Sequence, residues 1–319
     1  MTCLVTGGAG YIGSHIVASL QAHGYGAVAV DNMSSGVATR IPGVPLLTAD
    51  ISAEASIEAM ATFMREHKVT AVIHTAALKS VPESVADPLS YYRVNVGGTT
   101  NLLEAMKRAG VVNFVFSSTA AVYGMAKGEV TEDSPTLPIN PYGETKLIGE
   151  WLAADSARAW GLRQANLRYF NVAGAGWPDL ADTAVMNLVP IVFAALRDGK
   201  APKVFGDDYA TPDGSCVRDY VHVLDLAEAH LAALDYLERD DRPHTTFNVG
   251  TGTGSSVFEV IEQIRRTTGQ HFEIDVAERR AGDPPYLCAD VSRIRETLDW
   301  RAKNGLGEII DSAWAALQA

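Results

Sequence analysis

Cysteine is scarce in this chain of 319 residues. Its three cysteines, Cys3, Cys216 and Cys288, lie far apart and match no metal-binding spacing. A disulfide framework is therefore excluded as the basis of the fold, and no metal site is predicted. Reduced thiols are typical of a cytoplasmic protein, so we expect that location.

Basic residues are also few, because 26 Lys and Arg stand against 38 Asp and Glu and give a net charge of -12. Such a surface repels nucleic acid and anionic lipid, so neither is expected as a partner. No apolar run approaches the ~20 residues that span a membrane, and the N-terminus lacks the basic segment of a signal peptide. A composition of 47% hydrophobic and 20% charged residues indicates a globular protein.

Short apolar runs alternate with helical patterns through the first half of the chain. The runs predict strands at residues 3–6, 27–30, 71–74, 114–116 and 164–167. Helical patterns occupy the stretches between and after them, at 11–22, 54–67, 89–108 and 142–160. This alternation predicts an α/β fold with a Rossmann-type doubly wound parallel sheet, covered by helices on both faces.

The alternation ends near Gly174. Glycine, proline and aspartate become frequent at 173–182 and at 206–214, which is typical of a smaller, looser region with binding loops. We therefore predict a dinucleotide-binding domain over residues 1–174 and a smaller α/β substrate-binding domain over residues 175–319.

Part of the second half is expected to return to the first sheet. Residues 223–237 have a helical pattern, and residues 245–249 form another strand-like run. We assign the segment 219–250 to the first domain, which makes the substrate-binding domain discontinuous.

Three glycines stand between the first predicted strand and the first predicted helix. These glycines are Gly7, Gly10 and Gly13. In such a spacing the first glycine allows a tight turn, the second lets the backbone approach a pyrophosphate, and the third lets the helix pack closely on the strand. The helix N-terminus then offers free N–H donors to phosphates. Asp31 ends the second strand, where a carboxylate binds ribose hydroxyls and repels a 2′-phosphate, and Asn32 adds no positive charge. NAD is therefore predicted rather than NADP.

A tyrosine and a lysine share one face of the helix predicted at 142–160. Because Tyr142 and Lys146 are four residues apart, the ammonium can stabilise a phenolate, and a bound nicotinamide cation would lower the pKa of Tyr142 further. The pair would then act as a general base near neutral pH. The strand at 114–116 runs into hydroxyl residues that end at Thr119, at the sheet edge where ligands bind. A hydroxyl at that edge can hold the oxygen that Tyr142 deprotonates.

These motifs together resemble the extended short-chain dehydrogenase/reductase superfamily and, within it, the UDP-sugar 4-epimerases. The resemblance extends over nearly the whole chain. Besides the segment around Thr119, its most specific parts are residues 7–15, 74–79, 91–99, 142–146, 167–174, 205–209, 217–223 and 280–283.

The resemblance implies a role for each matching residue. Tyr142 would be the catalytic base, Lys146 its partner and a ribose ligand, and Thr119 the residue that positions the sugar 4-hydroxyl. These three, with Phe170, would also contact NAD. The other residues implied to line NAD are Gly7, Gly10, Tyr11, Ile12, Gly13, Asp31, Asn32, Met33, Ser34, Ser35, Gly36, Asp50, Ile51, Thr75, Ala76, Ala77, Lys79 and Asn95. Besides Thr119 and Tyr142, those implied to hold the UDP-sugar are Asn171, Asn187, Leu188, Lys203, Val204, Phe205, Arg218, Arg280, Asp283 and Leu287.

The implied activity inverts C4 of a UDP-hexose through a transient 4-keto sugar. UDP-glucose and UDP-galactose are the expected substrates. In these epimerases a tyrosine at the position of Leu287 restricts the enzyme to that pair, whereas a small residue also admits N-acetylated sugars. Leucine is intermediate, so UDP-GlcNAc and UDP-GalNAc stay open as substrates. The resemblance further implies a homodimer formed by the helices at 89–108 and 142–160.

Three alternatives remain at this point. An NAD-dependent sugar-nucleotide dehydratase would usually carry an Asp-Glu pair after the hydroxyl residue, but here Ala120 and Ala121 follow Thr119. A 4-epimerase of another UDP-sugar, a pentose or a uronate, would use the same machinery. A non-catalytic dinucleotide-binding regulator would tend to lose the tyrosine or the lysine, and this chain keeps both.

Overall fold

The computed structural model describes residues 1–126, 128–239, 242, 244–280 and 282–319. The chain divides into two compact units, and each is built from three segments. The first unit contains Met1–Val122, Pro138–Arg168 and Ala227–Phe247, and the second contains Tyr123–Leu137, Tyr169–Leu226 and Asn248–Ala319.

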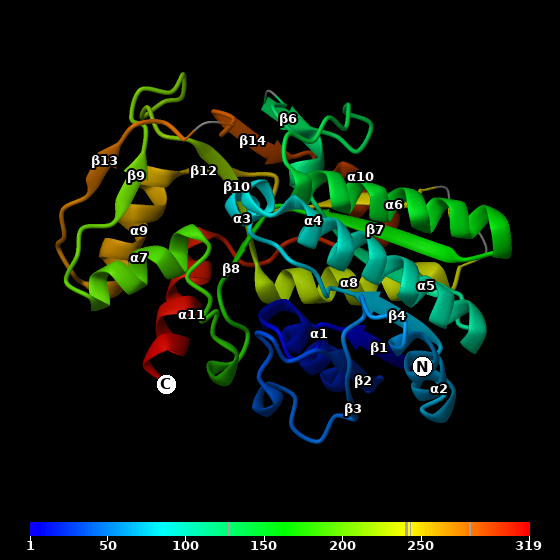
Figure 1. Cartoon of the computed structure of the whole chain (residues 1–319). Coiled ribbons are helices and arrows are strands. Elements are labelled where there is room, and N and C mark those ends of the chain that lie inside the picture. The colour runs from blue at the N-terminus through cyan, green and yellow to red at the C-terminus, as the bar shows by residue number, and fades with distance from the viewer. Residues whose placement is uncertain (127, 240–241, 243, 281) are drawn as a thin grey trace. The chain divides into compact units, whose positions relative to one another are not determined.

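A seven-stranded sheet has the strand order β11-β7-β5-β4-β1-β2-β3 (Figure 1). Its strands are β1 (Thr2–Thr6), β2 (Gly26–Asp31), β3 (Leu46–Thr48), β4 (Ala71–His74), β5 (Asn113–Thr119), β7 (Arg163–Tyr169) and β11 (Thr246–Val249). The strands β1, β2, β3, β4 and β5 pair in parallel. The order reverses direction at β1, as in a doubly wound Rossmann-type sheet, so the predicted fold class is confirmed.

The helices that accompany this sheet are α1 (Tyr11–Ala22), α2 (Ser56–Glu66), α3 (Val81–Ala86), α4 (Pro88–Tyr91), α5 (Gly98–Ala109), α6 (Pro141–Trp160) and α8 (Val223–Leu237). Shorter turns are η1 (Ala38–Arg40), the π-helical η2 (Tyr92–Gly97) and η3 (Ala120–Tyr123). Helices α2, α5 and α6 pack in a row. Beneath them the first unit buries a large apolar core that includes Met60, Leu102 and Phe114.

Two neighbouring residues of β5 show that helices cover both faces of the sheet. The Ser117 hydroxyl hydrogen-bonds Nε2 of His230 on α8, at 2.8 Å. The Ser118 hydroxyl donates to Glu150 on α6. Because successive side chains of a strand point to opposite faces, α8 and α6 lie on opposite sides of β5.

The single helix predicted at 89–108 is three consecutive helical segments, α4, η2 and α5. A π-helical turn contains more residues than an α-helical turn, so the apolar spacing alone does not reveal it. The short elements α3 and β3 were not predicted either. The three residues of β3 are half-buried or exposed and carry no strong apolar signal.

The second unit contains a sheet of order β12-β10-β14-β6, in which β8 also pairs with β10, and a separate pair of β13 with β9. Its strands are β6 (Gly128–Val130), β8 (Asn171–Ala173), β9 (Lys203–Phe205), β10 (Val217–His222), β12 (Gly254–Ser256), β13 (Asp275–Ala277) and β14 (Tyr286–Ala289). Its helices are η4 (Pro178–Leu180), α7 (Leu188–Arg197), α9 (Val257–Thr268), α10 (Ser292–Leu298) and α11 (Leu306–Gln318). Helices α7 and α9 pack on α11 around a core that includes Phe193, Ile261 and Ile309.

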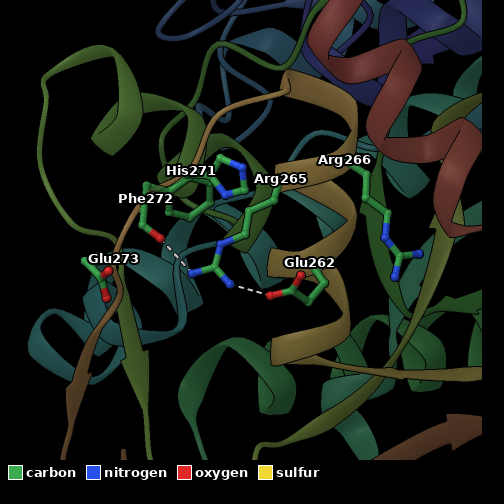
Figure 2. A pocket seen from close by; sticks show the side chains of 6 residues that line it. All are labelled: Glu262, Arg265, Arg266, His271, Phe272 and Glu273. Atoms are coloured by element: carbon green, nitrogen blue, oxygen red, sulfur yellow. Dashed lines mark hydrogen bonds and ion pairs between the residues drawn. The ribbon is translucent and has the colours of Figure 1, made fainter.

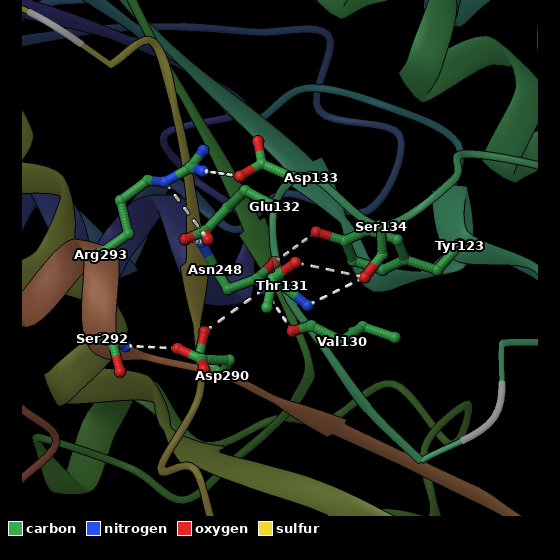
Figure 3. A network of polar contacts seen from close by, with 10 residues as sticks. All are labelled: Tyr123, Val130, Thr131, Glu132, Asp133, Ser134, Asn248, Asp290, Ser292 and Arg293. Carbon is green, nitrogen blue, oxygen red and sulfur yellow. Dashed lines mark hydrogen bonds and ion pairs between the residues drawn. The ribbon is translucent and has the colours of Figure 1, made fainter.

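A polar network fastens the segment Tyr123–Leu137 into the second unit (Figure 3). The Tyr123 hydroxyl donates to Oδ1 of Asn248 at 2.6 Å, and the Asn248 backbone N–H donates to the carboxylate of Glu132 at 2.8 Å. Arg293 pairs with Glu132 at 3.5 Å and donates to Asp133 at 2.6 Å. Burial raises the pKa of Glu132 despite these partners.

Across the described ranges, every helix is too short or too polar to cross a bilayer.

Candidate active site

The turn between β1 and α1 has the conformation that a glycine-rich phosphate site requires. Gly7 adopts φ of 67°, and its N–H donates to the carbonyl of Val30 at 2.7 Å. A Cβ at Gly13 would lie 2.0 Å from the Gly7 carbonyl oxygen, so only glycine lets α1 begin this close to the turn. The side chain of Gly10 provides no cap for α1, and the first turn of α1 contains no acidic residue, so no carboxylate of that turn offsets the positive end of the helix dipole.

Asp31, at the end of β2, is buried and held by two backbone donors. Its Oδ2 accepts from the N–H of Ala9 at 3.1 Å, and its Oδ1 accepts from the N–H of Met33 at 2.8 Å. A Cβ at Gly36 would lie 2.8 Å from Oδ1, so the segment from Asn32 to Gly36 wraps closely around this carboxylate. A carboxylate has more lone pairs than these two bonds use, which leaves acceptor capacity for ribose hydroxyls.

The loop after β4 contains another group of the implied cofactor residues. The Thr75 hydroxyl donates to the carbonyl of Thr6 at 2.6 Å, which ties this loop to β1. Asn95 accepts from the N–H of Leu78 at 2.8 Å and donates to the Leu78 carbonyl and the Thr145 hydroxyl, both at 3.0 Å. Asn95 therefore orients the loop from Thr75 to Lys79, while Lys79 itself is exposed.

The three candidate catalytic residues come together where β5 ends and α6 begins. Asn140 caps α6 by accepting from the N–H of Gly143 at 2.8 Å, which fixes the first turn containing Tyr142. The side chain of Thr119 interacts with the Tyr142 hydroxyl and lowers its pKa. Lys146 donates from Nζ to the carbonyl of Ser117 at 2.9 Å. All three predicted side chains are buried, at 8% exposure for Tyr142 and Thr119 and 3% for Lys146.

The electrostatics of the pair differ from the sequence-based expectation in one respect. Burial raises the pKa of Tyr142, and the hydrogen bond from Thr119 offsets this only in part. Burial also lowers the pKa of Lys146 to about 8, so the ammonium is still largely charged at pH 7. In the protein alone, desolvation therefore outweighs the Thr119 interaction, and the pKa of Tyr142 lies above its ordinary value rather than below it.

The remaining implied cofactor residues fall into two sets. Tyr11 and Ile12 begin α1, whereas Asp50 and Ile51 follow β3, all in the first unit. Asp50 is exposed, and its carboxylate accepts from the N–H and the hydroxyl of Ser52, both at 2.8 Å. Phe170 is buried in the second unit.

In the second unit, the structure brings together three of the implied UDP-sugar residues: Arg218 on β10, Leu287 on β14, and Asp283 just before β14. Arg218 lies directly opposite Leu287 in the parallel pairing of these strands. The guanidinium of Arg218 lies 3.6 Å from the carboxylate of Asp283. Arg280 stacks on the ring of Phe205 at 4.3 Å. Two arginines of this kind can contact a diphosphate directly.

The other implied UDP-sugar residues are spread over the second unit. Asn171 is exposed on β8, and Asn187 and Leu188 stand at the start of α7. Lys203 on β9 pairs at 3.7 Å with Asp275, its register partner on β13, and both side chains are exposed. Val204 is buried in the apolar core, so only its backbone is free to contact a ligand. Ala281, within the 280–283 motif, lies outside the described residues.

Asp219 was missed by sequence reasoning, although it organises the strands that carry Arg218 and Leu287. Its buried carboxylate accepts from the N–H groups of Thr251, Gly252 and Ala289 at 2.7, 3.0 and 3.3 Å. These bonds join β10 to β14 and to the loop after β11. An acid within an apolar strand was the available signal, because such a group is buried only with partners.

The second unit has a pocket of about 570 Å³ whose lining includes none of the predicted site residues (Figure 2). It is lined by Glu262, Arg265, Arg266, His271, Phe272 and Glu273. The Arg265 guanidinium pairs with Glu262 and donates to the Phe272 carbonyl at 2.7 Å. We assign no chemistry to this pocket.

The sheet and the glycine turn define a Rossmann-type dinucleotide-binding protein. The chain matches the model of the NAD dependent epimerase/dehydratase family over residues 3–250 and belongs to that family. A UDP-glucose 4-epimerase of Azospirillum brasilense is 47% identical to it over 317 residues, which cover 97% of this chain and 90% of that protein.

Solved structures agree with this relationship. A UDP-glucose 4-epimerase from Stenotrophomonas maltophila, with bound NAD and formylated UDP-arabinopyranose, superposes with a TM-score of 0.93 at 42% identity and covers 100% of this chain and 98% of that one. One from Brucella ovis in complex with NAD gives a TM-score of 0.92 at 41% identity, covering 98% and 97% of the two chains.

Proposed function

We propose that this protein is an NAD-dependent epimerase that inverts C4 of a UDP-hexose and interconverts UDP-glucose and UDP-galactose. The observation that carries the proposal is the buried arrangement of Tyr142, Thr119 and Lys146 at the end of β5. The first unit binds NAD at the glycine turn and Asp31, and the second unit binds the nucleotide end of the substrate through Arg218 and its neighbours. The full-length similarity to UDP-glucose 4-epimerases supports this reading.

Each catalytic residue has a defined task in this proposal. Bound NAD+ supplies a reversible hydride acceptor for C4, and its positive nicotinamide lowers the pKa that burial raises at Tyr142. Tyr142 takes the proton of the 4-hydroxyl as C4 is oxidised, keeps it while the keto sugar rotates, and returns it to the same oxygen when the hydride is given back to the opposite face of C4. Thr119 holds the sugar oxygen at hydrogen-bond distance. Lys146 stabilises the phenolate and binds the nicotinamide ribose.

A dehydratase is disfavoured by the residues that follow Thr119. Loss of water requires an additional acid and base beside the reacting carbons. Ala120 and Ala121 occupy the next two positions and have no titratable group. A regulator without activity is disfavoured because the Tyr142–Lys146 pair is intact and buried.

The direct test is turnover of UDP-galactose by the purified protein, with and without added NAD. We expect UDP-glucose as the product, resolved from the substrate by chromatography. Parallel reactions with UDP-GlcNAc, a UDP-pentose and a UDP-uronate define the range of sugars. A product lighter by one water would instead identify a dehydratase. Activity confined to pentoses or uronates would contradict the proposed substrate, and no turnover of any of them would contradict the reaction.

We also propose a cytoplasmic homodimer, and three exposed apolar side chains on neighbouring helices of the first unit support the dimer. Val85 on α3, Leu89 on α4 and Trp151 on α6 are 64%, 72% and 57% exposed. Because α3 and α4 both pack on α6, these side chains belong to one group of helices. Large apolar groups that gather on a surface are typical of an interface, and a second copy could cover them symmetrically.

Trp151→Glu should convert the dimer into a monomer, because it places a charge in the apolar interface. Sedimentation equilibrium measures the mass of both proteins. Val276→Glu is the matched control, since Val276 is an exposed apolar residue of the second unit, at 43% exposure. A monomeric parent protein, or a variant that stays dimeric, would contradict this assembly.

A further inference from the structure

The face of α6 that carries Tyr142 and Lys146 also carries Glu150, which has no task in the proposed mechanism. Tyr142, Lys146 and Glu150 follow one another at intervals of four, so they form one line along the helix. Glu150 is 5% exposed. Its Oε1 accepts a hydrogen bond at 2.5 Å from the hydroxyl of Ser118, the residue directly before Thr119.

The same carboxylate is bound on its other side by an arginine. Nε of Arg168 lies 2.9 Å from Oε1 of Glu150, and Nη2 lies 2.6 Å from Oε2. Arg168 belongs to β7, the strand next to β5 in the sheet. One buried carboxylate therefore joins the catalytic helix to two neighbouring strands of the first unit.

Close packing along the same contact leaves little freedom between α6 and β5. A Cβ at Gly149 would lie 2.3 Å from the ring of Phe116 on β5. A Cβ at Gly143 would lie 2.8 Å from the carbonyl oxygen of Ala121. With the backbones this near, a small slip of α6 changes the distance from Tyr142 to Thr119, and the bond from Ser118 to Glu150 opposes such a slip.

The Glu150–Arg168 ion pair is not expected to add much to the stability of the fold. A buried pair often contributes no more than well-packed apolar residues of the same volume, because both charges must be desolvated. The Glu150–Arg168 pair is also electrically balanced, so it adds no net charge to the face of α6 that carries Tyr142 and Lys146. Its distinctive effect is geometric, since it holds the acceptor of Ser118 in a fixed place.

We infer that Glu150 is a positioning residue for the proposed reaction: held by Arg168, its carboxylate anchors Ser118 and so sets the position of Thr119 against the Tyr142 hydroxyl. This inference deepens the proposed function and rests on it.

Ser118→Ala is the sharpest test, because it removes one hydroxyl and leaves the Glu150–Arg168 pair complete. We expect kcat for UDP-galactose to fall about tenfold, since small misplacements of reacting groups are costly. KM should change by less than about twofold, because no substrate contact is lost. Asn113→Ala is the control at the opposite end of β5, where the Asn113 amide donates to Glu238 at 2.7 Å. It should leave kcat unchanged.

Glu150→Gln separates positioning from stability. The amide keeps an oxygen for Ser118 but leaves the Arg168 charge without its counter-charge, which is strongly destabilising. We expect this variant to unfold at a lower temperature than Ser118→Ala and yet to retain a higher kcat. If kcat instead follows the order of the melting temperatures, the pair is merely structural and the inference is overturned.

A second readout needs no turnover. Ultraviolet titration of the Tyr142 phenol, taken as the difference between each protein and its Tyr142→Phe counterpart, should shift to higher pH in Ser118→Ala, because the Thr119 hydrogen bond lowers that pKa. The titration in Asn113→Ala should not move. An unshifted titration in Ser118→Ala overturns the inference. If the titration shifts in Ser118→Ala but the parent protein converts no UDP-sugar, the proposed function is contradicted and the inference about Glu150 is not.

Discussion

Tyr142→Phe is expected to fold, to bind NAD and to lose epimerase turnover by about 10²–10⁴-fold, the usual contribution of a positioned acid–base group. Phenylalanine keeps the ring, which is buried at 8% exposure, and removes only the hydroxyl. That hydroxyl bonds Thr119 within the protein, so its loss costs one hydrogen bond and the proton acceptor. Initial rates with UDP-galactose, together with NAD binding by calorimetry, measure the two effects separately.

Tyr236→Phe is the matched control for this variant. The Tyr236 hydroxyl donates to the carbonyl of His244 at 2.7 Å, so a buried, bonded phenol is removed elsewhere in the first unit. A small loss of stability with unchanged kcat is expected there. Near-normal turnover by Tyr142→Phe, or an equal loss in both variants, would refute the role of Tyr142 as base.

The shared helix face of Tyr142 and Lys146 was predictable from the sequence because its signal is local. Four-residue spacing places Tyr142 and Lys146 on one helix face whatever the helix packs against. Glu150 has the same spacing from Lys146, yet a glutamate on a helix ordinarily faces solvent. Its burial depends on Arg168, which reaches it only because β7 lies beside β5 in the sheet. The order of strands in a sheet is part of the tertiary structure, and the sequence around Glu150 does not indicate it.

The fold was predictable to a similar extent. Strands such as β1 and β4 lie inside the sheet and are nearly continuous apolar runs, so they were found from the sequence. The three-residue strands β3, β8 and β9 carry too few residues to show a period. The pKa of Tyr142 depends on how much burial costs its anion, and a helix pattern contains no measure of that cost.

Gly13→Ala is expected to weaken NAD binding by about ten- to a hundredfold, corresponding to roughly 1–3 kcal/mol of overpacking at the turn. The new methyl would lie 2.0 Å from the Gly7 carbonyl oxygen and 2.8 Å from Cα of Gly8. These are backbone atoms that cannot rotate away, so α1 must move off β1. The N–H groups of its first turn then lose their alignment on the pyrophosphate. Calorimetric titration with NAD measures the loss.

Binding of UDP provides an internal check on this variant, because its proposed contacts, including Arg218, belong to the second unit. UDP affinity should stay at the parent value while NAD affinity falls, since the damage begins at the turn after β1. Gly97→Ala is the matched control, because a Cβ there meets no atom within 4 Å. It lies in a helical segment, where alanine is favoured over glycine by about 1 kcal/mol, so the control should bind NAD normally and melt no lower than the parent. Equal NAD affinity in both variants would show that the close approach of α1 to the turn does not govern cofactor binding.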